Sequence, residues 1–80
     1  MINQSKVTST IEKALELSAG TITINSSIEN TEKWDSLGQL SILSALDELF
    51  NGKIADIPEI ASTSSVKSLI DILKENNLIE

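Results

Sequence analysis

The chain has 80 residues, twelve of them acidic and six basic, so its formal net charge is −6. It contains no cysteine and no histidine, which excludes disulfides, thiolate or imidazole metal sites and a serine activated by imidazole. A chain of this length buries about 60% of its unfolded surface, too little to shape a deep active site. We expect one domain over residues 1–80 that is not an enzyme and holds no metal ion.

The negative charge also bears on partners and location. It repels nucleic-acid phosphates and anionic membranes, and it attracts basic protein surfaces. The first residues lack the basic start and apolar run of a signal peptide, and no apolar stretch reaches membrane-spanning length. These features predict a cytoplasmic monomer that binds neither nucleic acid nor membranes.

The first predicted helix covers residues 4–17, where apolar side chains recur at helical spacing. Glu12 and the other charged residues of the segment fall off this stripe, and Gly20 is expected to end the helix. The residues of the stripe are Val7, Ile11, Ala14, Leu15 and Ser18.

A long connection over residues 18–35 follows, rich in Thr, Asn and Ser. Ile22, Ile24 and Ile28 are spaced through it, which predicts a loop that packs across the core. Residues 21–24 also read as a strand, but a lone strand has no partner in this chain. The pattern therefore favours an all-α fold.

The second predicted helix covers residues 36–51. Ser36 followed by Gln39 matches a capping box, and Asp35 adds negative charge at the positive end of the helix dipole. Asn51 and Gly52 are expected to end the helix. Its core side carries Ile42, Leu43, Leu46, Leu49 and Phe50.

The opposite side of this helix is polar, yet Leu37 and Leu40 project onto it near Ser36. Single exposed leucines are ordinary and need no explanation. Two apolar anchors followed by acidic Asp47 and Glu48 also describe a partner-binding face. The closeness to Ser36 favours this second interpretation.

Two further helices are predicted in the C-terminal third. Pro58 suits the first turn of a short helix over residues 58–61, and the Ser/Thr cluster of residues 62–65 caps a last helix. The buried face of that helix comprises Val66, Leu69, Ile70 and Leu73. We therefore expect an all-α four-helix bundle with three long helices, one short helix and a long first loop.

The segment Trp34-Asp35-Ser36-Leu37 resembles the acyl carrier proteins and their relatives, the peptidyl and D-alanyl carriers, which share Asp-Ser-Leu at the start of their second helix. The resemblance extends over about residues 4–76. It includes the long first loop, the proline-led short helix, the closing helix and the end of the second helix, Leu46-Asp47-Glu48-Leu49-Phe50. It implies a bundle of the acyl-carrier type.

The resemblance also implies the chemistry. A separate phosphopantetheinyl transferase uses coenzyme A and magnesium to join 4′-phosphopantetheine to the Ser36 hydroxyl. The thiol of that arm then holds an acyl or aminoacyl group as a thioester, and the carrier itself catalyses nothing. Asp35 belongs to the transferase recognition site and helps to position the magnesium ion, and Leu37 completes the cofactor-binding residues.

The position of Ser36 agrees with this role on physical grounds. A phosphodiester at the first position of a helix lies over free backbone N–H groups and the positive end of the dipole. The alternative is that Ser36 is only an N-cap, worth about 1 kcal/mol against alanine. Trp34 has two open interpretations, since it either anchors the loop on the bundle or touches the arm.

The resemblance further implies an apolar cleft for the cargo beside the second and third helices. Leu46, Ile54, Ile60 and Ala61 are its expected lining, with Leu43 as a further candidate. Each buried methylene would contribute roughly 0.8 kcal/mol. The same side chains also fit an ordinary core, and for Leu43 and Leu46 both descriptions can hold.

Two positions depart from the carriers of bulk fatty acid synthesis. Gly38 and Ser41 stand where those proteins usually have acidic residues. Enzymes with basic docking patches would find fewer charges, which predicts slower or different pairing because rim charges mainly govern encounter. A dedicated pathway for a specialised acyl chain, an amino acid, or a polysaccharide or secondary-metabolite intermediate is favoured.

Two alternatives stay open beside the acyl carrier. An aminoacyl or D-alanyl carrier would be loaded by an adenylating ligase. A non-covalent helical adaptor would use the face of Leu37 and Leu40 only for binding. A small enzyme is disfavoured because no carboxylates stand out with general acid–base spacing.

Overall fold

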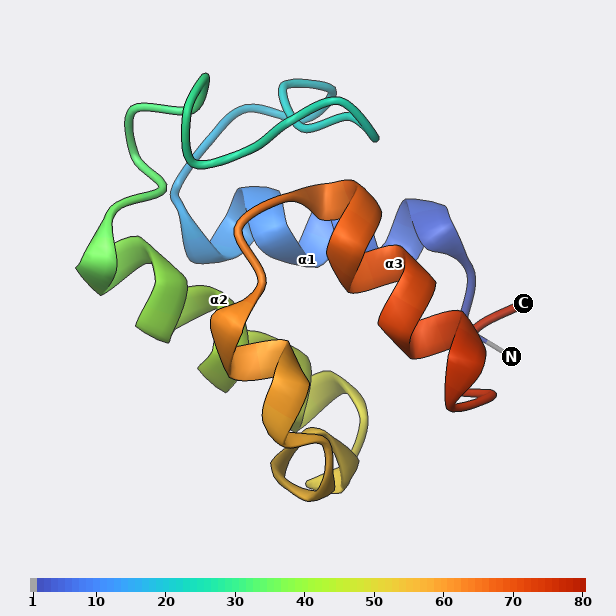
Figure 1. Ribbon diagram of the computed structural model, residues 1–80. Coiled ribbons are helices and arrows are strands. Elements are labelled where there is room, and N and C mark those ends of the chain that lie inside the picture. The colour runs from blue at the N-terminus through green and yellow to red at the C-terminus, as the bar shows by residue number, and fades with distance from the viewer. Residues whose placement is uncertain (1) are drawn as a thin grey trace.

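The computed structural model describes residues 2–80, and these residues form an all-helical fold (Figure 1). No strand occurs within this range; a single isolated bridge joins Ser27 to Ser65. The all-α prediction is therefore confirmed. The elements are the α-helices α1 (Gln4–Ala14), α2 (Ser36–Leu49) and α3 (Val66–Glu75), and the 3-10 helices η1 (Lys53–Asp56) and η2 (Pro58–Ser62).

The segment expected to be the short third helix differs from the prediction. It forms the 3-10 helix η2 with Pro58 at its start, and η1 precedes it without having been predicted. Gly52 in the left-handed region begins η1, and Ile57 ends it one residue before the proline. Since Pro58 has no N–H to continue the first helix, the chain makes two short turns instead of one longer helix.

Helix α1 ends earlier than predicted, at Ala14. Its last turn closes where Glu16 takes a left-handed conformation with φ of 58° and Leu17 N donates to the Glu12 carbonyl at 2.8 Å. These are the features of a Schellman C-cap, in which an αL residue satisfies the last carbonyls. The prediction that Gly20 ends the helix is therefore wrong.

Asn51 and Gly52 end helix α2, as predicted. Asn51 has φ of 56°, and Gly52 N donates to the Asp47 carbonyl at 2.8 Å. At the other end of the chain, Asn77 plays the same part for α3, with φ of 58°. All three α-helices thus end on a left-handed residue that is not glycine.

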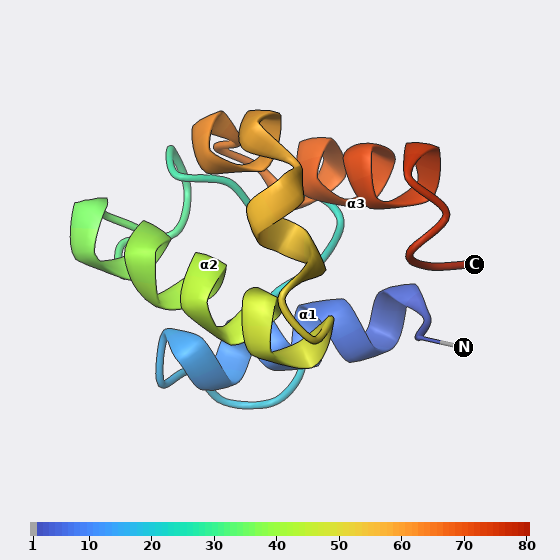
Figure 2. The same ribbon diagram turned by 90° about the horizontal axis from the view of Figure 1, so that it is seen from below.

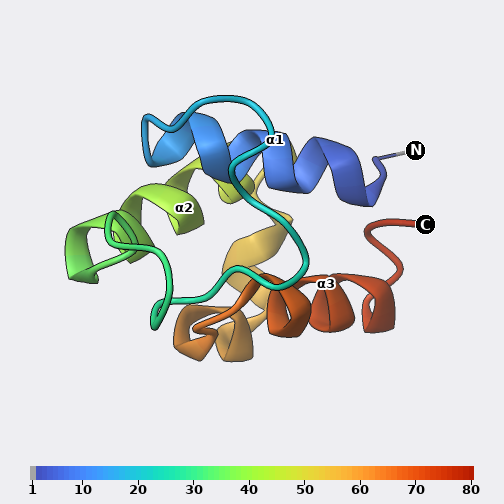
Figure 3. The same ribbon diagram turned by 90° about the horizontal axis from the view of Figure 1, so that it is seen from above.

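Helix α1 packs against both α2 and α3, while η1 and η2 lead from the end of α2 to the start of α3 (Figure 2). The first loop crosses from α1 toward the start of α3 before it reaches α2 (Figure 3). The two ends of the chain lie side by side, with Glu80 N donating to the Ile2 carbonyl at 3.3 Å. No helix within residues 2–80 combines the length and apolar character needed to cross a bilayer.

The core is one cluster of mostly aliphatic side chains to which Trp34 and Phe50 add the aromatic rings. The predicted buried face of α3 is confirmed in full, and of the predicted core side of α2, Leu43 and Leu49 are only partly buried. The buried apolar residues are Val7, Ile11, Leu15, Ile22, Trp34, Ile42, Leu46, Phe50, Ile54, Ile57, Ile60, Val66, Leu69, Ile70, Leu73 and Ile79.

The first loop packs on the core less than predicted. Of its three isoleucines only Ile22 is buried, while Ile24 and Ile28 are 37% and 43% exposed. The loop is also held by polar contacts: Ile22 N donates to the carboxylate of Glu12 at 2.9 Å. Glu12 lies off the apolar stripe, as predicted, but it is buried all the same, because the loop covers it.

The loop is also tied to the start of α3. Val66 N donates to the Ser26 carbonyl at 3.0 Å, and Ile28 N donates to the Ser64 carbonyl at 2.9 Å. Ser65 caps α3 as predicted, since its side chain accepts a hydrogen bond from Ser68 N at 3.2 Å. The loop therefore has a defined path over α1 and α3 that leads it to the first turn of α2.

Candidate functional site

The first turn of α2 differs from the capping box that was predicted around Ser36. Asp35, rather than Ser36, is the N-cap, and its Oδ1 accepts a hydrogen bond from Gly38 N at 2.8 Å. Ser36 is the first helical residue and is exposed, and its hydroxyl bonds to no other group within residues 2–80. The predicted capping box is wrong, and the hydroxyl oxygen is accessible to a reagent from solvent.

Gln39, the other member of the expected box, has a different role. Its Oε1 accepts a hydrogen bond from Trp34 Nε1 at 2.7 Å. Its Nε2 donates to the carbonyls of Ala61 at 3.2 Å and Thr63 at 2.9 Å. One side chain thus joins the first loop, α2 and the connection from η2 to α3.

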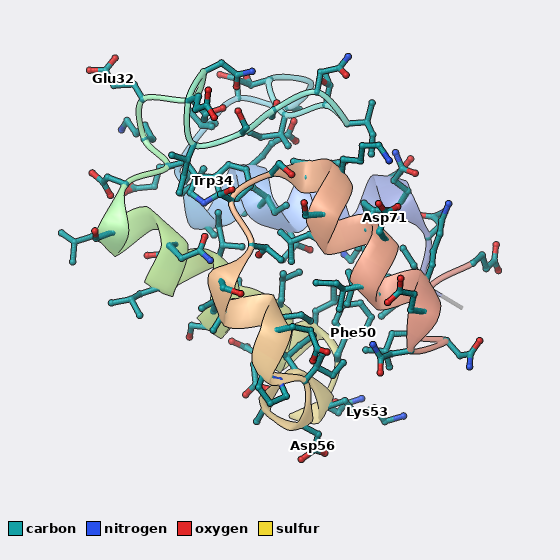
Figure 4. All side chains as sticks on the ribbon, in the orientation of Figure 1. Glu32, Trp34, Phe50, Lys53, Asp56 and Asp71 are labelled. Atoms are coloured by element: carbon teal, nitrogen blue, oxygen red, sulfur yellow. The ribbon has the colours of Figure 1, made fainter. Side chains whose placement is uncertain are left out.

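The same contacts support the first interpretation of Trp34, an anchor for the loop. Its side chain is only 1% exposed and lies beneath the first loop, close to the connection between η2 and α3 (Figure 4). Trp34 therefore anchors the loop on the bundle. Part of it also borders the surface hollow beside Ser36.

The loop approaches α2 closely at Gly38. A Cβ atom at this position would collide with the carbonyl oxygen of Lys33 and would lie 3.0 Å from Leu15 Cδ2. The absence of an acidic residue here therefore has a steric reason. The exposed Ser41 carries no such constraint.

A hollow of about 740 Å³ opens directly beside Ser36. It lies between the start of α2 and the segment joining η2 to α3, and it combines apolar walls with polar edges. Its lining comprises Ile28, Trp34, Asp35, Ser36, Gln39, Leu40, Leu43, Ala61, Ser62, Thr63 and Ser64.

A second groove, of about 330 Å³, continues along α2 toward η1 and η2. Leu43 and Ala61 border both cavities, so the groove adjoins the hollow beside Ser36. We refer to it as the α2–η groove. Its lining comprises Leu43, Ser44, Asp47, Ile54, Ala55, Ile57, Pro58, Ile60 and Ala61.

The predicted cleft residues separate in the structure. Ile54, Ile60 and Ala61 line the α2–η groove together with Leu43, but Leu46 is fully buried in the core and does not reach it. The remaining lining residues were not predicted to belong to the cleft: Ser44, Asp47, Ala55, Ile57 and Pro58. The sequence signal for these residues was Pro58 preceded by the apolar Ile57, a pair that indicates a turn with one side chain packed inward.

The predicted partner-binding residues also divide between two sides of α2. Leu37 and Leu40 are 75% and 64% exposed, and Glu48 is exposed as well. Asp47 is only partly buried and borders the α2–η groove. The exposed face of α2 therefore holds the two leucines with one carboxylate, whereas the second carboxylate belongs to the groove.

Residues 2–80 contain no group of three acidic, histidine or cysteine side chains that would hold a metal ion. The only ion pair in the same range joins Lys67 and Asp71 on α3, at 3.4 Å and well exposed. No protein-family model, no curated protein and no solved structure matches the chain. A functional assignment therefore depends on the site itself and on the resemblance at Asp35-Ser36-Leu37.

Proposed function

We propose that the protein is a carrier that holds an acyl group on a 4′-phosphopantetheine arm attached to Ser36. The observation that carries the proposal is the exposed, unbonded hydroxyl of Ser36 at the first position of α2, beside a hollow. The sequence Asp35-Ser36-Leu37 around it resembles the attachment signature of the carriers. The chain itself would catalyse no step.

The first turn of α2 fits a phosphodiester. The Asp35 side chain accepts a hydrogen bond from Gly38 N. The N–H groups of Ser36 and Leu37 have no partner within residues 2–80. These donors and the positive end of the helix dipole stabilise an anion at the Ser36 oxygen. The carboxylate of Asp35 lines the same hollow, where it can contact a metal ion that the transferase brings with coenzyme A.

The attachment step transfers the phosphopantetheinyl group from coenzyme A to the Ser36 oxygen. The Ser36 oxygen attacks the phosphorus atom of coenzyme A that bears the pantetheine, the pyrophosphate P–O bond breaks, and 3′,5′-ADP leaves. The hydroxyl proton passes to a base of the transferase, since no histidine exists in this chain. Bound in this way, the arm supplies a thiol that carries the cargo as a thioester.

The hollow beside Ser36 and the α2–η groove offer space for the arm and its cargo. The hollow beside Ser36 offers polar carbonyls and hydroxyls at its edge, and the α2–η groove behind it is mainly apolar. In this proposal the bundle is of the acyl-carrier type, with η2 in the position of the short third helix. Residues that line the groove would shield a short acyl chain from water.

Partners would dock on the exposed face of α2. Leu37 and Leu40 supply apolar anchors there, and Glu48 with the net charge of −6 attracts a basic rim. The proposed partners are a phosphopantetheinyl transferase and enzymes that load or process the cargo. We propose that the carrier acts as a cytoplasmic monomer.

Intact-mass measurement after incubation with coenzyme A, magnesium and a broad phosphopantetheinyl transferase tests the proposal. We expect a mass gain of one phosphopantetheine in the native chain and in Ser41→Ala, a matched exposed serine on the same helix. Ser36→Ala should show no gain. An unchanged mass of the native chain, while a known carrier is converted in the same mixture, would refute the proposal.

The exposure of Leu37 and Leu40 also favours a second candidate, a non-covalent helical adaptor. Such a protein would bind partners through this face and would need no arm. The same mass experiment separates the two functions, since an adaptor stays unmodified and its partner binding is unaffected by Ser36→Ala.

A further inference from the structure

Ile28 of the first loop is an exposed apolar residue with a fixed main chain. Its side chain is 43% exposed and lines the hollow beside Ser36. Its N–H donates to the Ser64 carbonyl at 2.9 Å, and the bridge between Ser27 and Ser65 joins the neighbouring residues of the same two segments. The loop therefore holds Ile28 at the edge of the hollow.

Apolar side chains border the hollow from two different segments. Helix α2 contributes Leu40, which is 64% exposed, together with Ser36 itself. The other side consists of Ile28 and the connection from η2 to α3. The hollow that contains the expected attachment point thus has an exposed apolar residue on each side. Burial of these two side chains against a ligand would remove apolar surface from water.

Three consecutive hydroxyl residues, Ser62, Thr63 and Ser64, form the polar edge of the hollow. Ser62 Oγ donates to the Glu59 carbonyl at 3.0 Å, and Thr63 Oγ1 donates to the Ile60 carbonyl at 2.7 Å. The hydroxyl of the exposed Ser64 bonds to no other group within residues 2–80. It is the hydroxyl on this edge that is available to a ligand.

The part of a phosphopantetheine arm nearest its phosphate matches this arrangement. A short methylene ester link joins the phosphate to a carbon that bears two methyl groups, and a hydroxyl and then an amide follow. Because Ser36 lines the hollow, an arm attached there keeps its dimethyl group close to the apolar walls. A tethered group has a high effective concentration, so a small contact area suffices to hold it.

We propose that the hollow holds the phosphate end of the arm: the dimethyl group packs between Ile28 and Leu40, and the first amide N–H of the arm donates to Ser64 Oγ. The inference rests on the proposed attachment at Ser36. It assigns to the first loop a direct contact with the cofactor. The thiol end of the arm stays free to reach the partner enzymes.

NMR spectroscopy of the loaded protein tests the apolar contact without any substitution. An isotope-labelled chain is converted with unlabelled coenzyme A by a broad phosphopantetheinyl transferase, and intact mass verifies the conversion. We expect nuclear Overhauser effects from the methyl protons of the arm to the methyl groups of Ile28 and Leu40. Ile24 is the internal control and should show none, because it lies in the same loop and is 37% exposed but does not line the hollow.

Two matched substitutions, Ile28→Ser and Ile24→Ser, add the chemical shift of the arm's methyl groups as a second readout. The indole of Trp34 borders the hollow, so its ring current should displace these resonances from their positions in free phosphopantetheine. Ile28→Ser should reduce the displacement by about half or more, because the loss of one apolar wall lowers the population of the bound arm. Ile24→Ser should leave it unchanged.

The polar contact has its own pair of variants. The first amide of the arm should exchange with water more slowly than in free phosphopantetheine. Ser64→Ala should raise its exchange rate about two- to tenfold, the range given by one hydrogen bond. Ser62→Ala is the control, since that hydroxyl is already bonded to the Glu59 carbonyl. Equal rates in the native chain and in both variants would overturn the assignment of Ser64.

The failure of this inference is distinct from a failure of the carrier function. Arm methyl resonances at their free positions, with no Overhauser effect to Ile28 or Leu40, overturn the inference, and so does an equal response of Ile28→Ser and Ile24→Ser. The carrier function survives these results, because the intact mass has already shown the arm on the protein. A chain that gains no mass removes both.

Discussion

Gln39 accepts a hydrogen bond from the indole of Trp34 at 2.7 Å, and this contact fixes the long first loop to the helix that bears Ser36. The same amide donates to the backbone 22 and 24 residues further on, at Ala61 and Thr63. The Gln39 side chain therefore joins three of the segments that line the hollow beside Ser36. Its loss would loosen three segments together.

Gln39→Ala should destabilise the protein by about 2 kcal/mol, because it leaves the buried indole N–H of Trp34 without an acceptor. Urea unfolding followed by fluorescence measures this directly, since Trp34 is the only tryptophan. Gln4→Ala, at the start of α1, is the control and should change the free energy of unfolding by less than about 0.5 kcal/mol. Equal values for the two variants would contradict the bridging role.

Gly38→Glu should destabilise the fold by more than about 2 kcal/mol, although it introduces the acidic residue that bulk fatty-acid carriers usually have at this position. The new Cβ would collide with the carbonyl oxygen of Lys33 and push the loop away from α2. Ser41→Glu introduces the same charge one turn further on at an exposed site.

Thermal unfolding of both variants provides the measurement. Ser41→Glu should stay within about 0.5 kcal/mol of the native protein. A well-tolerated Gly38→Glu would mean that the loop yields easily and that the close approach does not constrain this position.

Asp35→Ala should cost about 1 kcal/mol of unfolding free energy, because it removes the side chain that accepts from Gly38 N. Ser36→Ala should have an effect below about 0.5 kcal/mol, since its hydroxyl caps nothing. Denaturant titration of the unmodified protein checks both values. A larger loss for Ser36→Ala than for Asp35→Ala would assign the cap to the serine instead.

Asp47→Leu should stabilise the unloaded protein by about 1 kcal/mol. It removes a buried acceptor without a donor and a negative charge in the last turn of α2, where the helix dipole disfavours it. Glu48→Leu lacks the first of these effects and should gain less. Chemical denaturation compares the two, and a destabilised Asp47→Leu would show that the carboxylate has a structural partner.

Local sequence patterns were enough to predict the three α-helices, though not η1. The stripe of α3 and, apart from the exposed Ser18, that of α1 follow from apolar residues at helical spacing. The end of α2 follows from Asn51-Gly52, because these signals act within a few residues of one another. The exposed leucines also follow from the periodicity of one helix, whereas Ser36 was singled out by the resemblance at Asp35-Ser36-Leu37. The end of α1 was missed because a non-glycine residue, Glu16, takes the left-handed conformation.

The details of the site required the tertiary structure. The bridge made by Gln39, the burial of Glu12 beneath the loop and the steric demand for glycine at position 38 each depend on segments that approach from elsewhere in the chain. The burial of Asp47 Oδ1 without a hydrogen-bond partner likewise shows only in the folded chain. Periodicity tells which side of a helix is apolar, but only the packing of distant segments decides which polar atoms lose their contact with solvent.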